Sequence, residues 1–197
     1  MEDIVIRRLC KSFGGRPVLT DFDARLPAGG ITCLMAPSGW GKTTLLRILL
    51  GLTAADSGTI TGLEGLRPGA VFQEDRLCPW LSPADNLRLT APGLTAAGAG
   101  EALGSVGLGS CADAPLSALS GGMRRRVSIL RALVCPCDVL LLDEPFRGLD
   151  GETRALTIAE TLRRRAGRSM LVVTHDPEEP RILGAAQTIV CGAAEGG

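Results

Sequence analysis

Short apolar runs along this chain alternate with segments in which apolar residues recur every three or four positions. The runs are rich in β-branched residues and predict strands at residues 4–9, 18–26, 31–35, 59–61, 69–73, 139–142, 170–174 and 187–191. The helical repeats predict helices at residues 43–50, 83–89, 99–106, 123–134 and 152–165. Strands that alternate with helices indicate an α/β fold around a sheet with parallel strands.

Residues 76–118 differ from the rest of the chain because Ala, Gly, Leu and Pro dominate them and their helical repeats are short. We expect a small helical insert here, which together with the next helix forms a helical subdomain at about residues 76–134. We expect residues 1–192 as a whole to form a single domain, followed by a short tail at 193–197.

The 197-residue chain carries 21 Lys and Arg against 21 Asp and Glu, so its formal net charge is zero. Nucleic-acid-binding domains usually show a basic footprint, and therefore no nucleic-acid partner is expected. No run of 18 apolar residues predicts a membrane-spanning helix. The first ten residues carry acids and lack the apolar core of a secretion signal, so we expect the protein in the cytoplasm.

A glycine-rich loop follows the predicted strand at 31–35 and leads directly into a helix. The loop consists of Ala36, Pro37, Ser38, Gly39, Trp40, Gly41, Lys42, Thr43 and Thr44. Backbone N–H groups of such a loop bind phosphate, Lys42 adds charge for the β- and γ-phosphates, and the Thr43 hydroxyl suits Mg²⁺. The usual pattern begins with Gly where this chain has Ala36, so the first turn is expected to differ slightly. We expect Trp40 to face solvent or a partner.

Two acids stand at the carboxyl end of the buried strand predicted at 139–142. Asp143 and Glu144 precede Pro145, at the edge of the sheet where ligands of α/β proteins bind. Asp143 suits the ligand shell of Mg²⁺, and Glu144 could orient or deprotonate an attacking water. A strand that simply ends in solvated acids is the alternative, which the phosphate loop makes the weaker one.

Two further polar residues follow predicted strands. His175 is the only histidine and follows the strand at 170–174, where it can reach a γ-phosphate or polarise a water. Gln73 ends the strand at 69–73, and its amide oxygen could join the ligands of Mg²⁺. We therefore predict the catalytic residues Lys42, Glu144 and His175 and the metal ligands Thr43, Gln73 and Asp143.

A second candidate phosphate site precedes the helix predicted at 123–134. The segment reads Leu119, Ser120, Gly121, Gly122 and Met123. Ser120 is expected to cap the helix, and Gly121 and Gly122 let backbone N–H groups approach an anion closely. The segment resembles the signature motif of ATP-binding-cassette (ABC) ATPases, which usually ends in Gln where this chain has Met123.

Other motifs of the ABC family occur in the family's order along about residues 2–191. The resembling positions are Phe13 for the aromatic that stacks on adenine, 36–43 for the first phosphate motif, Gln73 for the Q-loop, 139–144 for the second motif with its catalytic Glu, 148–150 for the D-loop and His175 for the switch histidine. One such motif is moderately specific, whereas all of them in order are very specific.

The resemblance implies an α/β fold: a P-loop NTPase core with a mixed β-sheet, an N-terminal antiparallel β subdomain and a small α-helical insert. It implies an ATPase that uses ATP and Mg²⁺, with two nucleotides sandwiched between two subunits, identical or different. Residues 120–122 would then bind nucleotide held by the opposing subunit. A monomer is accordingly expected to hydrolyse little ATP.

A narrower resemblance lies in residues 72–82, which are similar to the Q-loop region of nitrate, sulfonate and taurine importer ATPases. In that family a short helix of the membrane subunit docks beside the Q-loop, and Trp80 and Leu81 could be the contacts; packing within the insert is the alternative. The resemblance implies an energy-coupling ATPase of a small-solute importer. Its partner would be a transmembrane permease, and its location the cytoplasmic face of the cell membrane.

Other functions explain the sequence less well. A soluble ABC-type ATPase in DNA repair or translation is disfavoured because we find no long coiled-coil insert, no tandem cassette and no basic footprint. A small-molecule kinase with the same phosphate loop would not explain residues 119–122 or 148–150.

The basic runs at 124–126 and 163–165 lie on predicted helices, and we interpret both as solvated helix surface, with 124–126 alternatively meeting the opposing nucleotide. In the helix that carries the second run, the face expected to pack on the core consists of Leu156, Ala159 and Leu162.

Overall fold

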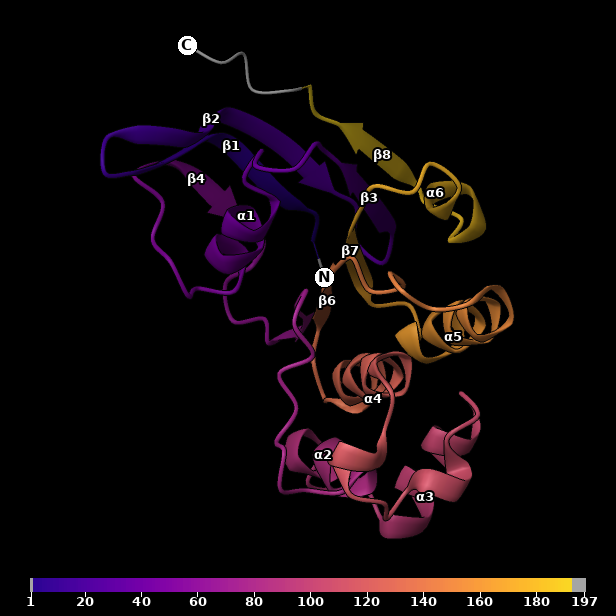
Figure 1. The fold of residues 1–197 in the computed structure, drawn as a ribbon. Helices are drawn as coiled ribbons and strands as arrows, with labels where there is room; N and C mark the ends of the chain where they lie inside the picture. The colour runs from indigo at the N-terminus through magenta and orange to yellow at the C-terminus, as the bar shows by residue number, and fades with distance from the viewer. Residues whose placement is uncertain (1, 193–197) are drawn as a thin grey trace.

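The computed structural model describes residues 2–192, and their strands form two separate sheets (Figure 1). The first sheet is antiparallel, in the order β2-β1-β4, and consists of β1 (Ile4–Phe13), β2 (Arg16–Leu26) and β4 (Ser57–Thr61). The predicted tail at 193–197 lies outside the described residues.

The second sheet is parallel, in the order β5-β6-β7-β3-β8. Its strands are β3 (Ile31–Met35), β5 (Pro68–Val71), β6 (Val139–Asp143), β7 (Ser169–Thr174) and β8 (Gln187–Val190). The adjacent strands β6 and β7 are buried at every position, as their nearly continuous apolar runs require. Because Asp143 pairs with Val173, the residues that follow these two strands lie beside each other.

Helices cover both faces of the parallel sheet. They are α1 (Lys42–Leu49), α2 (Pro83–Thr90), α3 (Ala96–Gly104), α4 (Gly121–Val134), α5 (Gly151–Arg165) and α6 (Glu179–Ile182). Helix α1 packs between the two sheets, whereas α4 packs on the opposite face and carries α2 and α3 on its outer side (Figure 1). Within residues 2–192 we find no helix with the length and apolar character needed to cross a bilayer.

One difference from the predicted elements falls near the site. Strand β5 ends at Val71, so Gln73 lies in the loop beyond the strand and not at its last position. The ladder with β6 stops there because the next two carbonyl groups, of Phe72 and Gln73, accept hydrogen bonds from Arg125 on α4.

The predicted packing face of α5 is wrong at two of its three residues. Leu156 and Ala159 are exposed, Leu162 is half-buried against the core, and the buried residues are instead Thr157, Ile158 and Thr161. The two threonine hydroxyls donate to carbonyl groups four residues earlier in the same helix, at 2.7 and 2.8 Å. Since a threonine bonded in this way presents only its methyl group to the core, it packs as an apolar residue that hydropathy does not reveal.

Candidate active site

The phosphate loop connects β3 to α1 and lines a cavity of about 420 Å³, which we call the phosphate-loop cavity. Its lining consists of Val18, Ser38, Gly39, Gly41, Lys42, Thr43, Thr44, Gln73, Asp143, Glu144 and Arg147. Most of the predicted nucleotide and metal residues therefore meet in one place. Val18 and Arg147 also belong to the lining, and no motif in the sequence pointed to either.

Backbone geometry explains the glycines of the loop. Gly39 and Gly41 have φ values of 82° and 106°, and a Cβ at Gly41 would lie 2.8 Å from Val18 Cγ1. Ala36 does not have a positive φ, so the backbone at this position does not require the left-handed conformation that a glycine would permit. Lys42 Nζ donates to the carbonyl groups of Ala36 and Pro37 at 2.7 and 2.8 Å, which holds the ammonium group over the loop.

The two aromatic residues predicted near the nucleotide have different surroundings. Trp40, predicted to face solvent or a partner, is half-buried: its ring meets that of Phe22 edge-on, with centroids 5.2 Å apart, and it packs against the core around α1. Phe13 is 51% exposed at the end of β1, with Lys11 Nζ 5.2 Å from its ring centroid. It lies outside the lining of the phosphate-loop cavity.

Asp143 is buried at the end of β6 and accepts a hydrogen bond from the Thr43 hydroxyl at 2.9 Å. Burial raises the pKa of Asp143 above its usual range, while the Thr43 hydrogen bond and the charge of Lys42 act in the opposite direction. The contact joins the phosphate loop to the second acidic motif, as the predicted metal site requires.

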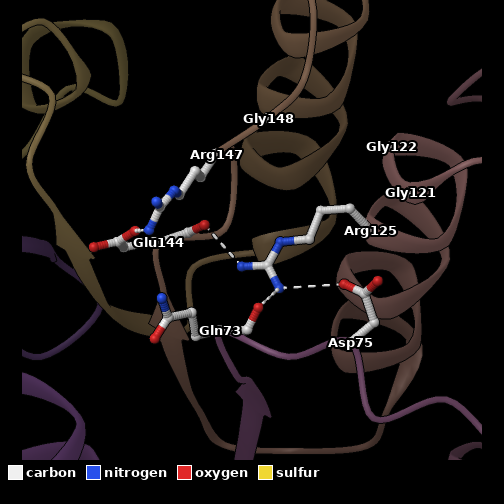
Figure 2. A pocket seen from close by; sticks show the side chains of 8 residues that line it. All are labelled: Gln73, Asp75, Gly121, Gly122, Arg125, Glu144, Arg147 and Gly148. Atoms are coloured by element: carbon white, nitrogen blue, oxygen red, sulfur yellow. Dashed lines mark hydrogen bonds and ion pairs between the residues drawn. The ribbon is translucent and has the colours of Figure 1, made fainter.

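Glu144 follows with a positive φ of 44°, which its main-chain contacts maintain. Its N–H donates to the Val173 carbonyl at 2.9 Å, and its carbonyl accepts from Arg125 at 2.7 Å. Its side chain meets two others. Arg147 Nη1 donates to Oε2 at 2.8 Å (Figure 2), and His175 Nδ1 lies 3.5 Å from Oε1. Glu144 and His175 thus come together as predicted.

Arg125 contradicts the interpretation of residues 124–126 as solvated surface. Its side chain is 7% exposed and reaches from α4 toward Gln73 and Asp75, as Figure 2 shows. The guanidinium donates to the carbonyl groups of Phe72, Gln73, Asp143, Glu144 and Pro145 and pairs with Asp75 at 3.4 Å. Burial lowers the pKa of Arg125, an effect that the charge of Asp75 opposes. One side chain therefore connects α4, the Gln73 loop and the end of β6.

The run at 163–165 is also only partly solvated. Arg163 is mostly exposed, whereas Arg164 is largely buried against Glu160. Arg165 donates to the carbonyl groups of Gly29 and Arg168, each at 2.6 Å.

The signature segment begins α4 as predicted. Ser120 is its N-cap, and its hydroxyl accepts from the Met123 N–H at 3.2 Å. Gly121 and Gly122 line a second cavity of about 420 Å³, the signature-side cavity, with Gln73, Asp75, Arg125, Glu144, Arg147 and Gly148 (Figure 2). The loop glycines 39 and 41 do not belong to this lining, so one chain presents its two predicted phosphate-binding segments in different cavities.

The segment after Gln73 leaves a large aromatic side chain in solvent. Trp80 is 81% exposed, which excludes packing within the insert for this residue, while Leu81 is half-buried. The buried Asn86 side chain binds the Cys78 N–H at 2.8 Å and fixes the loop that carries Trp80. Beside it runs a groove of about 290 Å³ lined by Asp75, Leu77, Pro79, Leu116, Ser117 and Arg124.

Sequence comparison identifies relatives over almost the whole chain. The chain is 42% identical over 190 residues to the aliphatic sulfonates import ATP-binding protein SsuB 1 of Pseudomonas savastanoi pv. phaseolicola, covering 94% of this chain and 79% of that protein. It is also 42% identical over 186 residues to the protein of the same name from Paracoccus denitrificans, covering 91% and 76%.

The structure of MJ0796, a bacterial ABC transporter cassette solved as a dimer, aligns with a TM-score of 0.82 at 24% identity, covering 96% of this chain and 94% of that one. This likeness confirms the predicted fold class, although the core sheet of the described residues is parallel and not mixed as predicted. The family model described as ABC transporter matches residues 19–147. The chain belongs to the ABC transporter family, as an ATP-hydrolysing ATP-binding subunit.

Proposed function

We propose that this subunit powers the import of small organic anions and that aliphatic sulfonates, named for its relatives, are the substrate class. The observation that supports the ATP-driven part most directly is the phosphate-loop cavity, where Lys42, Thr43, Asp143 and Glu144 meet. The solute itself would contact other subunits, so the substrate class rests on the relatives alone.

In this proposal the loop 36–44 and the N-terminus of α1 bind the phosphates of ATP, and Phe13 stacks on adenine. Thr43, Gln73 and Asp143 offer hydroxyl, amide and carboxylate oxygens at one cavity, which are the donors that Mg²⁺ prefers. When bound there, Mg²⁺ would offset the charge of the phosphate oxygens. The Thr43–Asp143 contact at 2.9 Å supports this site because it brings two of these donors together.

Glu144 is the residue we assign as general base. Asp143 is buried and bonded to Thr43, whereas the Glu144 carboxylate borders the cavity and faces His175. Water attacks the γ-phosphorus, its proton passes to Glu144, and the bond to the ADP oxygen breaks to release phosphate. His175 would orient the water or the γ-phosphate, and Lys42 would stabilise charge on the phosphate oxygens.

Two subunits would be needed for this reaction. The signature glycines and the phosphate loop of one chain line different cavities, so residues 120–122 would complete the site of a second cassette. That second subunit can be identical or different. A transmembrane permease would occupy the groove beside Trp80, and the protein would then lie peripherally at the cytoplasmic face of the membrane. No nucleic-acid partner is proposed.

The proposal is tested with Glu144→Gln in the full chain. We expect ATP hydrolysis to fall by roughly a hundredfold or more, because the amide cannot accept the proton of the attacking water. ATP binding should persist, and the variant should accumulate as an ATP-bound dimer in size-exclusion chromatography. Glu101→Gln, an exposed change on α3, is the control and should retain activity. Normal turnover by Glu144→Gln would refute the assignment.

A further inference from the structure

Glu144 has a fixed main chain but a side chain whose direction depends on two neighbours. Its N–H and carbonyl group are bonded to Val173 and Arg125, at 2.9 and 2.7 Å, so the backbone leaves little freedom. The carboxylate is 12% exposed, and its contacts across the cavity edge are Arg147 on Oε2 and His175 beside Oε1. A change in the position of the Arg147 side chain is therefore expected to change the position of the Glu144 carboxylate.

Arg147 occupies a junction between three cavities. It lines the phosphate-loop cavity, the signature-side cavity and a smaller cavity of about 190 Å³ around His175. Its side chain is 59% exposed, yet its guanidinium turns back onto Glu144 at 2.8 Å, and its N–H donates to the Glu144 carbonyl at 3.3 Å (Figure 2). Because Arg147 is exposed and Glu144 is nearly buried, we expect this contact to set the orientation of the carboxylate and to contribute little to the stability of the fold.

We propose that Arg147 is a positioning residue for ATP hydrolysis, which holds Oε2 of Glu144 so that Oε1 remains available to the attacking water beside His175. The inference rests on the proposed role of Glu144 as base. Charge-assisted hydrogen bonds from arginine fix carboxylate geometry strongly. Without this contact the carboxylate rotates between several positions, and fewer of the bound ATP molecules face a correctly placed base.

The same chain offers a matched pair outside the site. Arg163 Nη2 lies 2.7 Å from Glu160 Oε1, also three residues apart, with side chains 63% and 6% exposed. Arg163 lies outside the three cavities described above. Removing this arginine therefore changes charge and local contacts to a similar extent, with no effect expected on the reaction.

The test measures steady-state ATP hydrolysis by the full chain with Arg147→Ala, Arg147→Lys and Arg163→Ala. We expect Arg147→Ala to lower kcat roughly tenfold while KM for ATP changes less than about twofold. Arg147→Lys should recover part of the loss because the ammonium can still bond Oε2. Arg163→Ala should match the unsubstituted protein.

A second measurement separates positioning from direct phosphate binding. We compare the Kd for ATP of Glu144→Gln with that of Glu144→Gln combined with Arg147→Ala, by calorimetry. Equal values support the proposal. A roughly tenfold weaker Kd in the double variant would overturn it, since Arg147 would then bind phosphate. An unchanged kcat in Arg147→Ala would also overturn it, while turnover by Glu144→Gln alone would instead contradict the proposed function.

Discussion

Residues 36–44 build the phosphate loop from one continuous stretch of chain, whereas the signature-side cavity takes its lining from three separate segments, near residues 73–75, 121–125 and 144–148. The proposed phosphate contacts of the loop come from its own backbone, and its lysine contacts carbonyl groups five and six residues away. The signature-side cavity depends instead on Arg125, which bonds main-chain groups from two distant segments. We therefore expect the phosphate loop, a local site, to tolerate substitutions elsewhere in the chain. The signature-side cavity is assembled from distant segments, and its structure should depend on single side chains such as Arg125.

The largest expected effect comes from breaking the assembled region with Arg125→Met. The change leaves buried carbonyl groups without donors and Asp75 without its partner, so the free energy of unfolding should fall by about 3 kcal/mol. Urea denaturation measures this loss. Arg125→Lys should recover only part of it, because an ammonium cannot reproduce the planar set of donors.

Arg124→Met is the neighbouring control for this experiment and should cost far less, since Arg124 is half-buried at the groove beside Trp80. The affinity for ATP should change less than about threefold in Arg125→Met, because the phosphate loop is built locally. A stable Arg125→Met variant would contradict the view that this guanidinium holds the region together.

Lys42→Ala tests the phosphate loop. In contrast to Arg125→Met, it should lower the affinity for ATP strongly and the free energy of unfolding only slightly. We expect the affinity for ATP to fall by about a hundredfold, because the phosphates lose their point charge. The free energy of unfolding should change little, since the ammonium bonds only two carbonyl groups of its own loop. Calorimetry and urea denaturation give the two values, with Arg47→Ala on the exposed face of α1 as the control. Unchanged affinity would contradict the proposed phosphate site.

The same contrast explains what the sequence could predict. The loop, Asp143, Glu144 and His175 follow predicted strands directly, so chain order and strand ends were sufficient to bring them together. Arg125 could not be recognised because three consecutive arginines spread over about 200° of a helix, and hydropathy does not tell which of them points inward.

Arg147 was missed for a related reason. It has no motif of its own, and its contact arises from the turn after Glu144, where its N–H bonds the Glu144 carbonyl. The packing face of α5 failed because Thr157 and Thr161 satisfy their hydroxyls within the helix. These three errors share one cause: a polar side chain whose partner is set by the folded chain cannot be distinguished from a solvated one.

The smallest expected effect concerns Glu160 on α5, which joins the core to the insert by accepting from the Ser105 hydroxyl at 2.6 Å and from Arg163 and Arg164. These partners hold the pKa of Glu160 near 2, below its ordinary 4.5, although burial alone would raise it. A depressed pKa stabilises the fold above pH 4.5, and this contribution is lost as the pH falls toward 2. Glu160→Gln should therefore lower the free energy of unfolding by about 2 kcal/mol at pH 7 and by progressively less in acid. Urea denaturation from pH 7 to pH 3 measures how the free energies of unfolding of Glu160→Gln and of the unsubstituted protein converge. The exposed Glu178→Gln is the control. A difference between the two free energies that stays constant with pH would exclude this ionic link between insert and core.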